Sequence, residues 1–218
     1  MMRLSSYNGN PFIGVYCVAN EELSLVPLDC QDSLVDDIKT CLEVEVIRTS
    51  LASSTILGTL MAMNSYGAVT SDMVSLSELR SLRGKLRFRR VKDRVNAFGN
   101  NILVNDTAAL VNPDLDNASI RTIADILNVE VVKGSVAGYN TVGSVCTVTN
   151  KGLLCHPLAT KEEQDMLKLL FKVPVAVGTL NYGSRTVGAS ILANTKGAAV
   201  GSKTTPIEMG RVEDALYL

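Results

Sequence analysis

Five cysteines and one histidine are the side chains of this chain that could supply a nucleophile and its base. A thiolate next to an imidazole is the arrangement that nucleophilic catalysis by cysteine requires. Because His156 is the single histidine, any such pair must use it, and a zinc site built from several histidines is excluded. The cysteines are Cys17, Cys30, Cys41, Cys146 and Cys155.

The positions of the cysteines in the sequence favour structural roles. Cys17 and Cys146 occupy the same position in two copies of an internal repeat, which is typical of core residues. Cys41 falls on the apolar face of a predicted helix, and we expect Cys30 to be partly exposed. An odd number of cysteines without a CxxC pair fits a reducing compartment better than a disulfide framework.

His156 is also explained by a structural role. It precedes Pro157 in one copy of the repeat, as Asn112 precedes Pro113 in another. We therefore predict that His156 caps a turn and takes no part in catalysis. No segment matches GxxxxGK[ST], GxGxxG or GxSxG, the motifs of phosphate-binding loops, dinucleotide sites and nucleophile elbows. The sequence predicts no catalytic residue, no metal and no cofactor.

The composition favours a globular protein without a strong electrostatic preference. The chain has 218 residues, of which 46% are hydrophobic and 20% charged, as is ordinary for a folded domain. Its apolar runs are far shorter than the roughly 20 residues that span a bilayer, and its first residues do not form a signal peptide. A formal net charge of −1 argues against binding that depends mainly on nucleic acid phosphates. We expect a cytoplasmic monomer, with neither a membrane nor DNA as a partner.

The chain contains five copies of one pattern, in which a glycine is followed by an apolar run and then by an asparagine. The glycines are 44, 41, 44 and 45 residues apart, so the repeat is about 44 residues long. The glycines are Gly14, Gly58, Gly99, Gly143 and Gly188. The asparagines are Asn20, Asn64, Asn105, Asn150 and Asn194.

Each copy is predicted to form a β-hairpin, a helix and a third strand. Asparagine and glycine suit the tight turn between two short apolar runs, which therefore pair as a hairpin. A helix follows, as in "DNASIRTIADIL", where apolar residues recur at helical spacing. Two of the helices are predicted to begin with a capping box, Ser75 with Glu78 and Thr160 with Glu163.

The fifth copy ends in a helix and lacks its third strand. Residues 1–7 align with the strand that precedes each of the other copies, so this N-terminal strand is predicted to complete the fifth unit. Such pairing closes a ring and leaves fewer exposed strand edges. The predicted fold is α/β, a closed five-fold pseudosymmetric β/α propeller that forms a single domain over residues 1–218. Its repeats are about 8–52, 53–95, 96–137, 138–182 and 183–218, the last closed by 1–7.

Two segments resemble the translation initiation factor 6 family: "RFRRVKDRVNAFGNNILVNDTAALVNPDLD" at residues 87–116 and "VGSVCTVTNKGLLCHP" at residues 142–157. The resemblance covers essentially the whole chain, at the length of archaeal members. It implies the pentein fold, a five-fold β/α ring, and a role in protein biosynthesis and ribosome biogenesis. It further implies binding to the large ribosomal subunit, mainly through ribosomal proteins near the joining face, which sterically prevents association with the small subunit.

An enzyme is the alternative to this binding function. Guanidino-group-modifying enzymes such as arginine deiminases share the pentein architecture, and they use a cysteine nucleophile near the C-terminus with a histidine and acidic partners. No cysteine follows Cys155 in this chain, so the fifth copy cannot supply that nucleophile. The sequence therefore favours a binding protein over an enzyme.

The segments that precede the hairpins are predicted to emerge on one face of the ring and to contact the ribosome. They are rich in Asn, Ser and Tyr, which provide adaptable hydrogen bonds and amphipathic contact area. Each residue can equally be explained as an ordinary turn former. The "FGN" segment at 98–100 resembles part of the family's contact with the large subunit. The candidates are Asn8, Asn10, Ser53, Ser54, Thr55, Phe98, Gly99, Asn100, Tyr139, Asn140, Tyr182 and Ser184.

Eight basic residues and one acidic residue lie in the run from Arg80 to Arg94. Alternation along a strand places Lys85, Arg87 and Arg89 on one face of it. One interpretation is an ordinary solvated surface. The other is a strip that touches ribosomal RNA, because phosphate contacts need only correctly placed charge. The sequence leaves both interpretations open.

Overall fold

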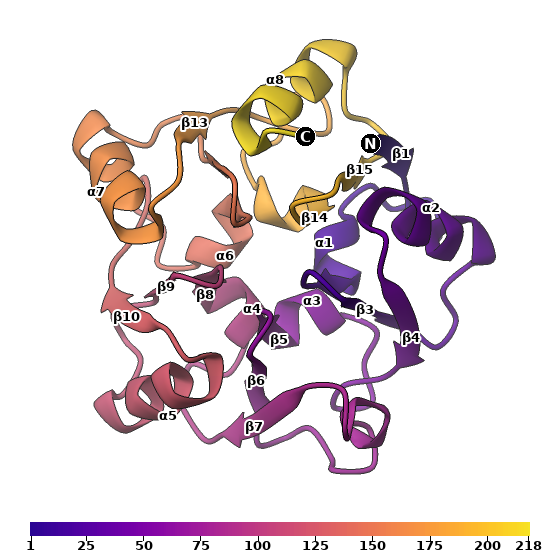
Figure 1. Ribbon diagram of the computed structural model, residues 1–218, viewed down its shortest axis with the longest axis vertical. Coiled ribbons are helices and arrows are strands. Elements are labelled where there is room, and N and C mark those ends of the chain that lie inside the picture. The colour runs from indigo at the N-terminus through magenta and orange to yellow at the C-terminus, as the bar shows by residue number, and fades with distance from the viewer.

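The computed structural model describes all of residues 1–218 as five three-stranded sheets set around a central axis (Figure 1). In every sheet two strands form an antiparallel hairpin, and a third strand pairs parallel to the second. The hairpins are β2 (Val18–Ala19) with β3 (Leu23–Pro27), β5 (Met61–Met63) with β6 (Gly67–Ser71), β8 (Ile102–Val104) with β9 (Ala108–Val111), β11 (Cys146–Val148) with β12 (Leu153–Cys155), and β14 (Ile191–Ala193) with β15 (Ala198–Gly201). The third strands are β4 (Glu45–Thr49), β7 (Arg87–Val91), β10 (Glu130–Lys133), β13 (Val175–Val177) and β1 (Met2–Ser5). The predicted α/β fold with five repeats is confirmed.

An 11-residue helix follows the hairpin in four of the five units and lies at the rim of the ring (Figure 1). Its inner face is apolar, as in the third unit, where Ile123, Ile126 and Leu127 are buried. One hydrophobic cluster belongs to each unit and its neighbour, so the core is divided into five parts. The helices are α2 (Asp32–Leu42), α5 (Asn117–Leu127), α7 (Lys161–Phe171) and α8 (Pro206–Leu216).

The second unit has no such helix, and the prediction of one after Ser75 is wrong. Between β6 and β7 its chain forms only the 3₁₀ helix η1 (Arg80–Leu82). Both capping-box hydrogen bonds are present, from the Ser75 amide to the Glu78 carboxylate at 2.9 Å and from the Glu78 amide to the Ser75 hydroxyl at 3.3 Å. Gly84, with φ +79°, then turns the chain into β7 before an α-helix can develop. The capping box at Thr160 does begin an α-helix, as predicted.

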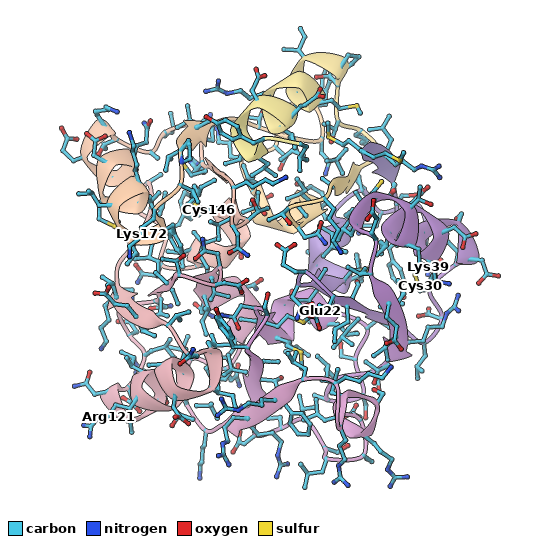
Figure 2. All side chains as sticks on the ribbon, viewed as in Figure 1. Glu22, Cys30, Lys39, Arg121, Cys146 and Lys172 are labelled. Atoms are coloured by element: carbon cyan, nitrogen blue, oxygen red, sulfur yellow. The ribbon has the colours of Figure 1, made fainter.

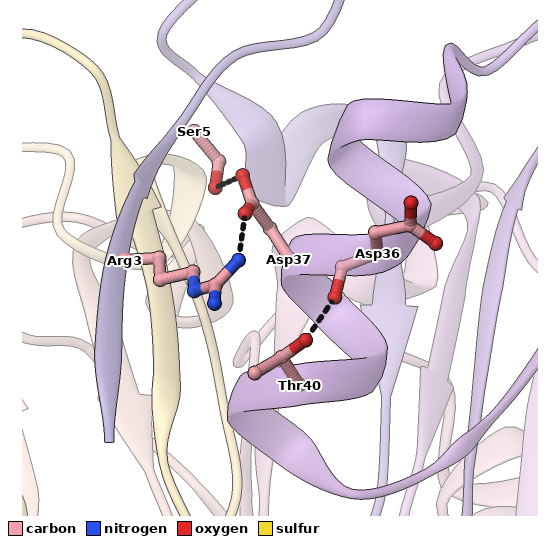
Figure 3. Close-up of polar contacts among 5 residues, drawn as sticks. All are labelled: Arg3, Ser5, Asp36, Asp37 and Thr40. Atoms are coloured by element: carbon pink, nitrogen blue, oxygen red, sulfur yellow. Dashed lines mark hydrogen bonds and ion pairs between the residues drawn. The ribbon is translucent and has the colours of Figure 1, made fainter.

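The N-terminal strand completes the fifth sheet, as predicted. β1 runs parallel to β15, with Met2 opposite Ala198 and Ser5 opposite Gly201. The same strand is tied to the first unit, because the Asp37 carboxylate on α2 accepts hydrogen bonds from Arg3 at 3.1 Å and from Ser5 at 2.8 Å (Figure 3). One strand therefore joins the two ends of the chain.

A short helical turn precedes every hairpin and was not predicted from the sequence. The turns are α1 (Ile13–Tyr16), α3 (Leu57–Leu60), α4 (Phe98–Asn101), α6 (Val142–Val145) and η2 (Gly188–Ser190). Each contains the repeated glycine and contacts the turns on both sides, and the fifth contacts the first. A Cβ on any of these glycines would lie only 1.8–2.2 Å from the carbonyl oxygen of the preceding unit's glycine. The glycine recurs because two backbones touch there.

The repeated asparagines form a second set of contacts around the axis, at the opposite end of the hairpins. Each side-chain amide donates to the backbone carbonyl of the next unit: Asn20 to Asn64 at 2.8 Å, Asn64 to Asn105 at 3.1 Å, Asn105 to Thr149 at 3.2 Å, and Asn194 to Asn20 at 3.3 Å. These residues are buried. Since buried polar groups must be hydrogen-bonded, these contacts fix the spacing of neighbouring units.

The fourth unit shows that the predicted repeat position of Asn150 is wrong by one residue. Thr149, not Asn150, closes the hairpin turn, with its amide donating to the Gly152 carbonyl at 2.9 Å. The Asn150 side chain instead pairs with Asp106 of the third unit. Asn150 directly follows Thr149, so the search for an asparagine aligned the fourth copy one residue too far along the chain.

Candidate interaction face

Tight turns between the third strand of one unit and the short helical turn of the next gather at one end of the five sheets, which we call the turn face. Four turns are closed by paired residues at 7–10, 51–54, 136–139 and 180–184. In the first, Asn8 and Gly9 have φ of 48° and 80°, and in the second, Ala52 and Ser53 have φ of 52° and 56°. Two successive positive φ values are the conformation of type I′ turns. The sequence places these turns where it carries Asn, Gly and Ser.

Acidic side chains hold three of the four turns in place. Glu78 accepts from the amide of Ser53 at 2.8 Å, and Glu163 accepts from that of Ala137 at 2.9 Å. Glu208 accepts from the amide of Gly183 at 2.8 Å. These carboxylates also cap their own chain segments. Glu163 and Glu208 therefore each join a turn to a helix start, whereas Glu78 joins its turn to the capping box at Ser75.

The pKa values of two of these carboxyl groups reflect their hydrogen bonds. Burial raises the pKa of Glu78, but the amides of Ser53 and Ser75 outweigh it and lower that pKa below its ordinary value. Burial likewise raises the pKa of Glu208, and the amides of Thr205 and Gly183 bring it below the usual value. Both groups are therefore ionised at neutral pH, as charge-assisted hydrogen bonds require.

The third unit enters its hairpin differently. Phe98 was predicted to lie on the contact surface, which requires exposure, and its burial makes that prediction wrong. Its Asp93 carboxylate accepts from the amides of Val95 at 2.9 Å and Asp116 at 3.1 Å. Phe98 follows with 0% exposure, within the hydrophobic cluster that includes Ile123. The residue that precedes the repeated glycine points into the core in every unit. In the other four units this residue is also apolar and buried: Ile13, Leu57, Val142 and Val187.

The other candidates lie at the turn face with different degrees of exposure. Asn10 and Ser54 accept hydrogen bonds from the amides of Phe12 at 2.9 Å and Ile56 at 3.3 Å, so their side chains serve the turns themselves. The exposed candidates are Asn8, Ser53, Thr55, Tyr139, Asn140 and Tyr182. The half-buried candidates are Asn10, Ser54, Gly99, Asn100 and Ser184.

Exposed apolar side chains at the same end were missed from the sequence. Leu28, Met73 and Leu158 follow the second hairpin strands of their units and are 65%, 67% and 61% exposed. Ile207, next to the turn-holding Glu208, is 87% exposed, and the predicted candidate Tyr182 is 84% exposed. Their repeat positions were visible, but single apolar residues outside the apolar runs give no periodic signal. Together they add apolar contact area to the hydrogen-bonding turns.

The cysteines and His156 are built into the core. All five cysteines are free and buried, so the expected partial exposure of Cys30 is wrong. Burial raises the pKa of Cys30 to about 11 and that of Cys146 well above its ordinary value, which keeps both thiols protonated. The Nδ1 of His156 accepts from the amide of Leu158 at 3.1 Å, so its predicted turn-capping role is confirmed.

Hollow space along the axis is small. A cavity of about 40 Å³ lies inside the asparagine ring. A second, mostly apolar hollow, lined by the repeated glycines and the first strand of each hairpin, measures about 120 Å³. Both are smaller than the roughly 300–1,000 Å³ of usual small-molecule sites. No helix has the length and apolarity needed to cross a membrane.

The basic residues Lys85, Arg87 and Arg89 lie on or beside β7, outside the turn face. All three are exposed, while Leu86 is buried and Phe88 is half-buried, so the predicted alternation is confirmed from 85 to 89. It ends there, because Arg90 is exposed and Val91 is buried. Lys85 forms an ion pair with Glu45 of the neighbouring unit.

The five units define a class of protein, a single-chain pseudosymmetric β/α ring. The chain belongs to the eIF-6 family, whose model matches residues 2–215. Proteins called translation initiation factor 6 are similar to it over nearly their whole length, and the family is one of translation factors.

Three of these relatives illustrate the similarity. The protein of Thermoplasma acidophilum is 38% identical over 216 residues, which cover 99% of this chain and 100% of the relative. That of Methanocaldococcus jannaschii is 40% identical, covering 97% and 96%, and that of Archaeoglobus fulgidus is 41% identical, covering 96% and 97%. A solved Pseudomonas aeruginosa DDAH in complex with citrulline aligns over 81% of this chain and 80% of its own, with 14% identity and a TM-score of 0.43, which is too low to carry an inference.

Proposed function

We propose that the protein binds the large ribosomal subunit through its turn face and thereby blocks association with the small subunit. The proposal is supported first by the family, whose members are named as translation initiation factors. The observation that carries it is the turn face, where exposed Asn, Ser and Tyr side chains lie at the same end of the sheets as exposed Leu, Met and Ile. Such a mixture is typical of surfaces that dock on proteins.

The mechanism is steric and needs no covalent chemistry. Turns that are already fixed by Glu78, Glu163 and Glu208 lose little conformational entropy on binding, which favours a stable complex. A specific contact buries on the order of 1,200–2,000 Å² in total. A factor held by such a contact occupies the joining surface and excludes the small subunit. We further propose that the protein acts as a cytoplasmic monomer, without enzymatic activity, and that the same binding serves subunit maturation.

Cosedimentation with separated ribosomal subunits tests this function. The protein should migrate with the large subunit on a sucrose gradient and not with the small one. Addition of excess protein should then reduce the fraction of joined ribosomes in proportion to the large subunits occupied. Binding to the small subunit, or binding to the large one without any effect on joining, contradicts the proposal.

A further inference from the structure

Positive charge collects on the outer rim of the second unit, where the helix is missing. β7 is an edge strand, paired with β6 alone. On one side of it a hollow of about 550 Å³ lies against α5, and on the other a hollow of about 540 Å³ reaches Tyr66. In Figure 2, Arg121 points away from the ring on the outer side of α5. We call the basic residues that line the two hollows the basic rim: Arg83, Lys85, Arg87, Arg89, Arg90, Lys92 and Arg121.

Most of this charge has no partner within the protein. Lys85 pairs with Glu45, and the Arg90 guanidinium donates to the Val74 carbonyl at 3.0 Å. The other five cations of the basic rim make neither an ion pair nor a side-chain hydrogen bond. A single carboxylate, Asp125, lines the two hollows. On a chain with a formal net charge of −1, this concentration creates a local field that attracts anions.

The arrangement of the cations suits a chain of phosphates. Arg87 and Arg89 are two residues apart on one strand and therefore about 6.6 Å apart along it. Arg121 extends the row onto α5. Arginine presents a planar fork that binds phosphate through two parallel hydrogen bonds. A regular row of such forks fits a polymer with regularly placed phosphates better than a peptide with scattered carboxylates.

An exposed aromatic ring adds a second recognition element. Tyr66 is 44% exposed and lines the same hollow as Arg83 and Arg87. A tyrosine beside a cationic groove is the combination on which unpaired nucleotide bases stack. Binding of an acidic protein would require only the positive charges, so the exposed tyrosine favours a nucleic acid as the partner.

We propose that the basic rim binds single-stranded RNA, with the arginines on the phosphates and Tyr66 against a base. RNA is the nucleic acid that fits a family of translation factors. The inference does not rest on ribosome binding by the turn face, because free RNA needs no ribosome.

Fluorescence anisotropy with a labelled oligouridine of about 16 nucleotides tests the inference. We expect the triple variant Arg87→Glu, Arg89→Glu, Arg121→Glu to bind at least tenfold more weakly than the unaltered protein. The slope of log affinity against log salt should fall by about 2, since each phosphate contact contributes about 0.7 on single strands. Tyr66→Ala should weaken binding severalfold while leaving the salt slope unchanged, and it keeps the test available if the triple variant does not fold.

A matched control carries the same change of net charge elsewhere. Lys39, Lys168 and Lys203 are exposed and free of ion pairs, and their replacement by Glu should alter affinity less than threefold. Equal losses in both triple variants, or competition by polyglutamate as effective as that by unlabelled RNA, overturn the inference. Failure of the unaltered protein to bind at low salt also overturns it. Cosedimentation with the large subunit, measured on the same variants, reports separately on the turn face.

Discussion

Gly99 lies so close to Gly58 that a Cβ on Gly99 would be 1.8 Å from the Gly58 carbonyl oxygen. The same backbone contact recurs between each unit and the one before it, and Gly14 closes the cycle by packing on Gly188. The repeated glycine is therefore a requirement of ring geometry. It is not a turn signal of a single hairpin.

Replacement of Gly99 by alanine should destabilise the whole ring. The obstruction is backbone, which cannot rotate away as a side chain can, so we expect a loss of about 3 kcal/mol or more in unfolding free energy. Urea denaturation followed by circular dichroism measures it. Gly210→Ala is the control, because nothing lies within 4 Å of a Cβ there; in the helix it should stabilise by about 0.5–1 kcal/mol. A Gly99→Ala protein as stable as the control contradicts this account of the ring.

Removal of residues 1–7 should expose two units at once. The fifth sheet loses β1 from its edge, and the first unit loses the contacts of Arg3 and Ser5 with Asp37 (Figure 3). The core also loses Tyr7, which is buried. We expect a drop of several kcal/mol, far more than Arg3→Gln alone, which removes an exposed pair worth at most about 1 kcal/mol. Thermal melts compare the two, and an unchanged melting temperature in the truncated protein rules out the closure described here.

The asparagine ring is incomplete in the fourth unit, and a substitution should complete it. Thr149 lacks the amide that Asn20, Asn64 and Asn105 donate to the next unit, so no side chain from the fourth unit reaches the carbonyl of Asn194. Thr149→Asn should add this hydrogen bond and stabilise the protein by about 0.5–1.5 kcal/mol. The reverse change, Asn105→Thr, should destabilise by a similar amount or more. Chemical denaturation of both variants tests the pair, and a loss of stability in Thr149→Asn speaks against the register.

His156 should make stability fall in mild acid. Burial, and then the positive charge of Arg185, lower its pKa below 6.5, although Glu163 opposes them. Its Nε2 is buried without a hydrogen-bond partner. As the pH falls through 6.5, the unfolded chain gains a proton that the folded chain does not hold, so the unfolding free energy decreases.

The variant His156→Asn removes this titration and keeps the cap, since Asn112 caps the equivalent turn through its side-chain oxygen at 2.8 Å. Its loss of stability between pH 7.5 and pH 5 should be smaller than that of the unaltered protein. Denaturation midpoints at the two pH values decide the question. Identical losses in both proteins exclude His156 as the cause.

The repeat made the main architecture predictable. Periodic glycines and apolar runs indicated five units, and the alignment of residues 1–7 with the other third strands indicated the closing strand, which β1 provides. The helix of the second unit was mispredicted, because its capping box forms without the helical segment that should follow. A capping box reports local hydrogen bonding, whereas the length of a helix depends on the residues and packing beyond it.

The candidate site was less predictable than the fold. Positive φ at Asn8 and Ser53 was foreseeable from residue type, but the burial of Phe98 depends on the helical turn α4, which no local signal announced. Likewise, the exposed Leu28 and Ile207 acquire meaning only when the strands bring them to one end of the ring. Long-range placement of this kind cannot be read from spacing within one repeat.

The contact proposed for Asn100 can be tested with one substitution. Asn100 is half-buried in α4, where its backbone amide donates to the Ala97 carbonyl at 3.1 Å and its side chain makes no hydrogen bond within the protein. The other units carry Val15, Thr59, Ser144 and Ala189 at this position, so the fold does not require an amide there. We expect Asn100→Glu to weaken binding to the large subunit at least tenfold, about 1.4 kcal/mol, and to shift stability by no more than about 0.5 kcal/mol. Quantitative cosedimentation and thermal melts measure the two effects.

Glutamate placed at the opposite end of the hairpins is the control for Asn100→Glu. Lys151 and Lys196 lie in the asparagine turns, where their ammonium groups donate to backbone carbonyls of neighbouring units. Their replacement should cost some stability but leave subunit binding nearly unchanged, because that end faces away from the proposed contact. Thr107→Glu changes an exposed turn position on the same side and breaks no side-chain hydrogen bond to a neighbouring unit. It therefore separates an effect on subunit binding from an effect on stability. If these three variants lose binding while Asn100→Glu retains it, the ribosome docks on the asparagine end and the turn face is the wrong surface.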